Sequence, residues 1–136
     1  ARLLQQAGCA GQVVGIDITE RLTSLGLRNL EADAGSHDLA SRLRFRCEDA
    51  HQAPGAADAA RFAFVVVSAA ADAQRVPQAL RERLRPGGRL IMPVCGADGE
   101  QQFVQVDRVT DGSFLEPVRL CEARFVSLIK TTSVGI

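Results

Sequence analysis

The apolar positions of this chain change their spacing along its length. Residues 62–68 form a continuous apolar run rich in β-branched side chains, the pattern of a parallel strand covered on both faces. Leucines at roughly helical spacing follow an earlier apolar strand and predict a helix from Thr19 to about Asp33. After Val94, residues 101–110 alternate between apolar and polar side chains, which is typical of an antiparallel strand with one wetter face.

The remaining patterns complete an alternation of strands and helices. Strands are expected at residues 12–18, 44–47, 62–68, 89–94, 101–110, 114–118 and 122–128, and helices at residues 1–7, 19–33, 38–43 and 77–84. Asp111-Gly112 is a hairpin-turn signal, and the residues at 85–88 predict a turn in which a glycine adopts a positive φ angle. This order indicates one α/β domain with a doubly wound, mostly parallel sheet and antiparallel C-terminal strands.

Composition and charge exclude several classes of partner. The 136 residues include 16 basic and 16 acidic side chains, so the net charge is zero and nucleic acid or an anionic membrane surface has no electrostatic footprint to bind. The longest uncharged apolar stretch, residues 62–71, is far shorter than the ~20 residues that a membrane-spanning helix requires. We therefore expect neither nucleic acid nor membrane as a partner.

Cysteine and histidine spacing argues against a metal site. The cysteines lie far apart without a C-x-x-C pair, at positions Cys9, Cys47, Cys95 and Cys121. Isolated cysteines of this kind are typical of small buried apolar residues in a reducing compartment. His37 and His51 have no partners at ligand spacing. These features predict an intracellular protein, with the cytoplasm as the first expectation and the mitochondrion as the other, and no bound metal.

Two acidic residues stand where predicted strands end. Asp17 closes the strand at residues 12–18, where a carboxylate can accept hydrogen bonds from both hydroxyls of a ribose. The alternative is that Asp17, together with Glu20, only stabilises the positive end of the following helix. Asp49 follows the strand at residues 44–47 in the same way, and its alternative is a solvated loop acid.

Small side chains follow the strand at residues 62–68. Ser68-Ala69-Ala70-Ala71 would allow a ligand to lie against the backbone at the carboxyl end of the strand, where open α/β sheets bind ligands. No G-x-S-x-G elbow surrounds Ser68, so a small spacer is favoured over a nucleophile. The arginines of the next helix and its end are expected on a solvated face, at positions Arg81, Arg83 and Arg85.

Three segments together resemble a known family. They are GIDITERL at 15–22, FVVVSAAADAQRVPQALRERLRPGGRLIMPV at 64–94 and QVDRVTDGS at 105–113. In order and spacing they are similar to protein-L-isoaspartate O-methyltransferases, especially the eukaryotic type, over nearly the whole chain to about Leu128. The resemblance implies a class I methyltransferase with a Rossmann-like fold. Its cofactor would be S-adenosyl-L-methionine, and its substrate the α-carboxyl of isoaspartyl residues in damaged proteins or peptides.

The resemblance also implies roles for individual residues. Asp17 would contact the cofactor ribose, while Asp49 would lie near the adenine beside Ala50. The family has G-D-G at the latter place, whereas this chain has Glu48-Asp49-Ala50, so both glycines are replaced. Of the small-residue loop, Ser68 and Ala69 would line the cofactor, and Ala70 and Ala71 the substrate path. No catalytic residue is assigned, because a carboxylate needs no general base to accept a methyl group.

One part of the family pattern would precede Ala1. The family's first, central strand and its G-x-G-x-G loop are missing, and the chain does not begin with Met, so we expect either a processed chain or a piece of a longer one. Without that strand the neighbouring strands at 12–18 and 62–68 would expose unpaired edges. The 136 residues alone are therefore expected to be inactive, with upstream residues or a partner chain completing the sheet.

A rival hypothesis is a degenerate, non-catalytic methyltransferase-like subunit with a structural role in a larger assembly. The replacement of the two glycines around Asp49 and the missing glycine-rich loop favour the rival. The acid at Asp17 and the small-residue loop at 68–71 favour the enzyme.

Overall fold

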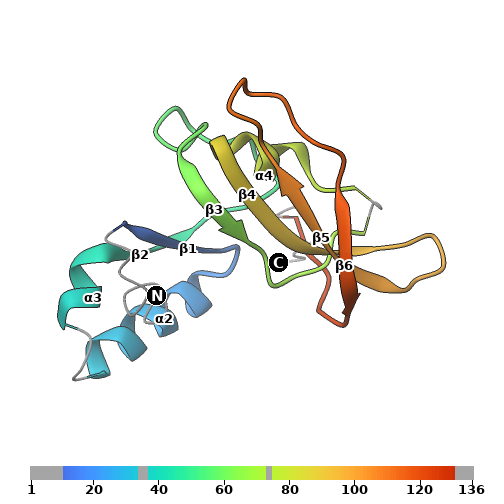
Figure 1. Ribbon diagram of the computed structural model, residues 1–136. Helices are drawn as coiled ribbons and strands as arrows, with labels where there is room; N and C mark the ends of the chain where they lie inside the picture. Colours follow the sequence, from blue (N-terminus) through green and yellow to red (C-terminus); the bar gives the residue numbers. More distant parts are fainter. Residues whose placement is uncertain (1–10, 34–36, 73–74, 131–136) are drawn as a thin grey trace. The chain divides into compact units, whose positions relative to one another are not determined.

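The computed structural model describes residues 11–33, 37–72 and 75–130 (Figure 1). The chain divides into two compact units, Ala1–Ala50 and His51–Ile136, and each unit is described by itself. The helix predicted at residues 1–7 lies outside the described residues.

The first unit is a pair of parallel strands, and two helices lie between them in the chain order. Strand β1 (Val13–Asp17) pairs with β2 (Leu43–Cys47) in continuous register from Val13 opposite Leu43 to Asp17 opposite Cys47. Helix α2 (Glu20–Ala32) and the short helix α3 (His37–Arg42) connect them. The predicted elements at 12–18, 19–33, 38–43 and 44–47 are thus confirmed with small shifts of their ends.

Phe45 explains two glycines of the first unit. A Cβ at Gly15 would lie 2.9 Å from the Phe45 ring, and one at Gly26 would lie 2.8 Å from it. Both distances are shorter than real Cβ contacts allow, so the ring occupies the space that the glycines leave. Gly26 costs helix propensity within α2, and this contact supplies the packing reason for it.

The second unit contains a four-stranded sheet in the order β3-β4-β5-β6 (Figure 1). Its elements are β3 (Phe62–Val66), α4 (Gln78–Glu82), β4 (Leu84–Cys95), β5 (Gln101–Asp107) and β6 (Val118–Ala123). Strands β3 and β4 are parallel and joined through α4, and β4, β5 and β6 are antiparallel neighbours. The predicted parallel crossover followed by antiparallel strands is confirmed.

The core of this unit lies on one face of the sheet. Leu90 and Met92 of β4 and Val106 of β5 are fully buried, as is Leu84, and Leu80 of α4 is buried with them. Alternate residues of a strand point to opposite faces, so the other face carries a different set.

That second face corrects one expectation about β3. Both faces of the run at 62–68 were expected to be covered, yet in the described residues the Phe64 side chain is 59% exposed and Val66 is also exposed. Val65, which lies between them, pairs with Leu90 of the buried face. The apolar run therefore includes side chains, Phe64 and Val66, that the described residues leave exposed.

The arrangement of the strands agrees with the expectation that their shared central neighbour is missing from this chain. The described strands form two separate sheets, β1-β2 and β3-β4-β5-β6. A central strand between β1 and β3 stays a prediction. A hairpin or a bent strand was expected from 114–118 and 122–128, and the structure has the single strand β6 there. It begins directly after Pro117, a residue that has no N–H to donate to a ladder.

The turn predicted at residues 85–88 is part of β4 in the structure. Gly87 has a φ of +76°, as expected, but β4 begins at Leu84 and continues through this position. Gly88 is required for a different reason. A Cβ there would lie 2.8 Å from the Arg85 carbonyl oxygen and 2.9 Å from that of Phe62, so only glycine permits this approach of β3.

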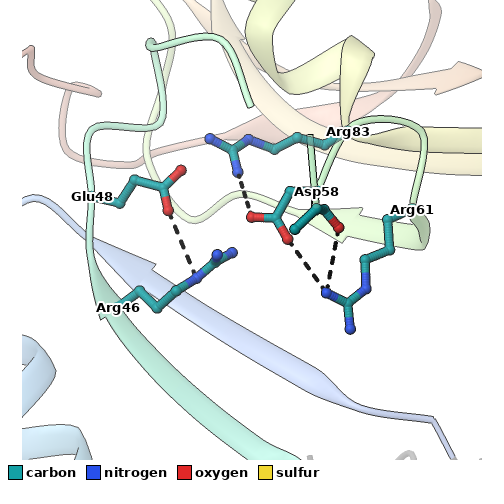
Figure 2. A network of polar contacts seen from close by, with 6 residues as sticks. Arg46, Glu48, Asp58, Arg61 and Arg83 are labelled. Carbon is teal, nitrogen blue, oxygen red and sulfur yellow. Dashed lines mark hydrogen bonds and ion pairs between the residues drawn. The ribbon is translucent and has the colours of Figure 1, made fainter. Parts of the chain in front are cut away.

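Arg83 does not lie on a solvated face. Its side chain is 2% exposed, and its Nη1 lies 3.8 Å from Oδ2 of Asp58, which is itself 4% exposed as a residue. Arg61 Nη1 lies 3.6 Å from the other oxygen of Asp58 (Figure 2). The same figure draws the pair within the first unit, in which Arg46 Nε lies 3.7 Å from Glu48 Oε2. A buried carboxylate therefore explains the position of Arg83.

Arg81 also departs from the expected solvated face. Its guanidinium lies 4.4 Å from the centre of the Phe114 ring, and that of Arg108 lies 5.2 Å from the same ring. Arg108 Nη1 also donates to the Leu84 carbonyl at 2.6 Å. Only Arg85 of the three arginines is exposed as expected.

Cysteine exposure corrects another expectation. The cysteines were predicted to be small buried residues, but Cys47 and Cys121 are exposed and Cys95 is partly exposed, all as free thiols. Cys9 lies outside the described residues.

The Arg89–Asp107 pair predicts a dependence of stability on pH. Arg89 Nε and Nη2 lie 2.7 Å and 2.9 Å from the Asp107 carboxylate oxygens, and these hydrogen bonds hold the pKa of Asp107 below its usual value against the opposing effect of partial burial. Because the folded pKa is the lower one, the pair stabilises the fold above the unfolded pKa of about 3.9, and this stabilisation is lost as the pH falls through the folded pKa.

We therefore expect Asp107→Asn to lose less stability than the parent between about pH 5 and pH 2. Urea unfolding of both proteins across this range measures the difference. Parallel curves for the two proteins would show that this carboxylate contributes nothing to the acid response.

Candidate functional site

Asp17 lies at the carboxyl end of β1, where the sequence placed it. Its Oδ1 accepts the Thr19 N–H at 2.7 Å, and its carbonyl oxygen accepts the Glu48 N–H at 2.9 Å. Its other carboxylate oxygen, Oδ2, has no hydrogen-bonding partner among the described residues. One carboxylate oxygen of Asp17 therefore accepts a hydrogen bond at the start of α2, and the other can accept one from a hydroxyl group of a ligand.

Asp49 lies beyond the end of the neighbouring strand. Because β1 and β2 are parallel and Asp17 is opposite Cys47, the chain after β2 leaves the sheet at the same edge as Asp17. Asp49 is only 9% exposed, so the alternative of a solvated loop acid is wrong. The structure thus brings both predicted acids to the carboxyl edge of the first unit's strands.

The residues around Asp49 show that the lost glycines cost no backbone strain. Among the described residues Ala60 is the one non-glycine residue with a positive φ, so Glu48 and Ala50 adopt ordinary conformations. Their side chains are compatible with this backbone, and both are partly exposed. The backbone at this place therefore does not require the conformational freedom of the replaced glycines.

The small-residue loop of the second unit is held between two segments of chain. Ala70 exchanges two hydrogen bonds with residues near the C-terminus, from its N–H to the Val126 carbonyl and to its carbonyl from the Leu128 N–H, each 2.7 Å long. Ala71 N–H donates to the Pro93 carbonyl at 3.1 Å, and Cys95 N–H donates to the Ala71 carbonyl at 3.0 Å. The loop therefore continues the sheet beyond β3.

This pairing changes the interpretation of the alanines. Ser68 is exposed and Ala69 partly exposed, but the side chains of Ala70 and Ala71 are buried in the described residues. Their small size is explained by close backbone packing, whereas an open crevice floor was expected. A role for Ala70 and Ala71 in substrate binding stays a prediction. Because both side chains are buried, such a role would depend on the chain around them.

The segment that pairs with Ala70 belongs to the strand expected at 122–128, but its pairing with Ala70 was not predicted. Phe125 is held by the side chain of Gln101, whose Nε2 donates to the Phe125 carbonyl at 2.9 Å and whose Oε1 accepts the Phe125 N–H at 2.6 Å. The Phe125 ring meets Phe103 edge to face, 5.1 Å between centroids. The side-chain amide of Gln101 makes hydrogen bonds of the kind that a neighbouring strand would make. The spacing of apolar residues in the sequence does not indicate such a contact.

We expect Ala70→Leu to destabilise the fold. Three extra side-chain carbons in a fully buried position cost about 1–3 kcal/mol through overpacking. Thermal unfolding should show a lower midpoint for Ala70→Leu than for Ala69→Leu, which changes a partly exposed neighbour. Equal midpoints would show that the loop opens easily.

A cavity of about 470 Å³ lies at the end of β4. Its walls come from the end of β4, the following turn, β5 and the start of β6, through Val94, Cys95, Gly96, Ala97, Asp98, Glu100, Gln102, Val104, Pro117 and Arg119. Val94 and Cys95 are also the neighbours of Ala71 in the sheet. The cavity therefore borders the small-residue loop, although the sequence analysis assigned none of its residues to a ligand site.

Other kinds of site find no support in the described part of the chain. No group of three or more histidine, cysteine, aspartate or glutamate side chains is placed to hold a metal ion there. The helices of the described ranges include none that is long and apolar enough to cross a membrane.

Comparisons with known proteins agree with the resemblance. The family model described as protein-L-isoaspartate(D-aspartate) O-methyltransferase matches residues 1–133. A protein-L-isoaspartate O-methyltransferase of Anaeromyxobacter dehalogenans is 35% identical over 122 residues, which are 90% of this chain and 54% of that protein. Protein-L-isoaspartate O-methyltransferase 1 of Arabidopsis thaliana is 35% identical over 107 residues, 78% of this chain and 44% of that protein.

A solved structure shares the fold. A Plasmodium falciparum protein, described as a protein-L-isoaspartate O-methyltransferase in complex with S-adenosyl-L-homocysteine, matches with a TM-score of 0.71 and 22% identity, over 88% of this chain and 53% of that one. The chain spans about half the length of the relatives that it matches. Because the family model matches nearly the whole of this chain, the chain belongs to the protein-L-isoaspartate O-methyltransferase family.

Proposed function

We propose that the protein containing this chain binds S-adenosyl-L-methionine and methylates the carboxyl group of isoaspartyl residues in damaged proteins. Membership of the family and the arrangement at the end of β1 support the proposal. The observation that carries it is Asp17, an acid at the carboxyl end of a parallel strand with one oxygen available for a ribose hydroxyl.

The residues present fit such a cofactor. Asp17 offers an acceptor for the ribose, and the chain around Asp49 leaves the sheet at the same edge, where an adenine would lie. The cofactor, when bound, supplies an electrophilic methyl group. In the second unit, Ser68 and Ala69 have small, accessible side chains, which fits the cofactor contact proposed for them.

The reaction requires little acid–base chemistry from the protein. A carboxyl group with a pKa of about 4 is already ionised at neutral pH, so no base has to activate it. The contribution of the chain is to orient the two reactants and to exclude water, and proximity of this kind supplies up to ~7–11 kcal/mol. We further propose an intracellular setting, which the free thiols at Cys47, Cys95 and Cys121 fit.

The test uses the full-length protein with a radiolabelled methyl donor and two peptides that differ only in an isoaspartyl or a normal aspartyl residue. We expect label to enter the isoaspartyl peptide alone and to be released by mild base, as from a methyl ester. Binding of S-adenosyl-L-homocysteine without any transfer would support the non-catalytic, structural alternative and contradict the proposal.

A further inference from the structure

The cavity at the end of β4 has an apolar floor and charged walls. Val94 and Val104 lie on the buried face of the sheet, and Pro117 adds a third apolar side chain to the floor. The side chains around this floor are polar, at Asp98, Glu100, Gln102 and Arg119. A pocket of this build holds a ligand by apolar contact and orients it by a few polar groups.

The donors of the cavity lie on its strand side. Gln102 pairs with Val94 across β4 and β5, and Arg119 pairs with Val104 across β5 and β6. Opposite residues of antiparallel strands point to the same face, so both side chains stand beside the apolar floor. The Arg119 guanidinium has no hydrogen bond or ion pair within the described residues.

The acceptors lie on the turn side. Gly96 N–H donates to the Glu100 carbonyl at 2.7 Å, and Asp98 Oδ1 accepts the Glu100 N–H at 3.1 Å, so the turn is closed by its own hydrogen bonds. The Asp98 carboxylate is thereby engaged in the turn. The Glu100 carboxylate has no partner among the described residues, and it faces the same cavity as Arg119.

The cavity lies next to the small-residue loop, in which Ala70 and Ala71 are the predicted substrate path. Ala71 pairs with Val94, and its carbonyl accepts the Cys95 N–H, so the end of β4 forms the border between the loop and the cavity. A polypeptide bound beside the loop at 68–71 would therefore have the cavity as its neighbour across the end of β4.

We infer that this cavity is a subsite for the protein substrate, next to the residue that is methylated, and that it selects a segment with an acidic and a basic side chain. This inference rests on the proposed function. The acidic group would bind Arg119 and Gln102, and the basic group would bind Glu100. Charged groups that bind in this way would each meet a side chain that lacks a counter-charge in the described residues.

The experiment uses the full-length protein and four isoaspartyl peptides. One carries an acidic and a basic residue near the isoaspartyl residue, two have one of these replaced by glutamine, and one has both replaced. Each peptide is made with a free and with an amidated C-terminus, which separates an acidic side chain from the terminal carboxylate as the bound group. Initial rates give KM and kcat, and fluorescence anisotropy gives the peptide Kd with S-adenosyl-L-homocysteine present.

We expect Arg119→Gln to raise KM and Kd by about tenfold for peptides with the acidic residue, with kcat unchanged and little effect on the others. Arg119→Glu should reverse the preference between acidic and basic peptides. Glu100→Gln should weaken only the peptides with the basic residue. Arg85→Gln is the matched control, because Arg85 is exposed and lies at the opposite end of β4 from the cavity.

Two results would overturn the inference. Equal effects of Arg119→Gln on all four peptides would show that the residue does not read charge, and unchanged values throughout would show that the peptide does not enter the cavity. If the parent protein methylates none of the isoaspartyl peptides, the proposed function is contradicted instead. The Kd values would then show separately whether the peptides bind in the cavity.

Discussion

Arg83→Met should lower the free energy of unfolding by about 3 kcal/mol or more, the scale observed when one partner of a buried ion pair is removed. The substitution keeps a side chain of similar length but leaves the Asp58 carboxylate buried without its buried counter-charge. Arg61 remains 3.6 Å from Asp58 and is largely exposed, so it compensates only in part. Urea unfolding followed by circular dichroism measures the loss.

Two further variants make this experiment decisive. Arg85→Met changes an exposed arginine two residues along the chain and should leave the midpoint nearly unchanged. The double variant Asp58→Leu/Arg83→Met removes both charges and should recover most of the lost stability, because apolar groups of similar volume replace a buried pair at little cost. If Arg83→Met alone unfolds at the parent's midpoint, the pair does not hold this unit together.

Asp17→Ala should weaken the binding of S-adenosyl-L-homocysteine to the full-length protein by about 1–3 kcal/mol, or roughly 5- to 150-fold. The reason is the loss of the acceptor at the end of β1 that we assign to the ribose hydroxyls. The substitution also removes the acceptor of the Thr19 N–H, so a structural effect has to be separated from the loss of binding. Calorimetric titration and thermal unfolding of each variant provide the two measurements.

Asp17→Asn separates these effects. It retains an oxygen for Thr19 and removes the negative charge, so we expect near-parental thermal stability and still a weaker affinity. Glu20→Gln changes the exposed acid in the first turn of α2 and should leave the affinity unchanged. A lower unfolding midpoint with unaltered affinity in Asp17→Ala would show that this acid serves only the helix.

The order of elements was predictable because it depends on short-range patterns. Continuous apolar runs predicted β1 and β3, leucine spacing predicted α2, and alternation of apolar and polar residues predicted β5, all of which the structure contains. Gly87 and Gly112 have positive φ angles, as the turn signals around them indicated. The family motifs have the same local character, which is why the resemblance could be stated from residues 15–22, 64–94 and 105–113 alone.

The failures concern contacts between distant parts of the chain. The charged pattern of the helix at 77–84 predicts a solvated face, but the depth at which Arg83 lies depends on Asp58, which arrives from a loop 25 residues earlier (83 − 58). The ladder at Ala70 likewise requires residues 126–128, which reach it through a side-chain clamp on Phe125. Neither pairing leaves a periodic signal in the sequence.

The sequence by itself therefore determined the succession of strands and helices, the family, and the two acids at the ends of β1 and β2. These follow from local propensity, from hydrophobic period and from residues that stand next to one another along the chain. The tertiary structure alone decided which small residues are accessible, which arginine is buried, and that a cavity with Arg119 and Glu100 on its walls lies beside the Ala71 ladder. Burial and charge pairing are properties of neighbours in space, and the chain brings those neighbours together only when its strands pair.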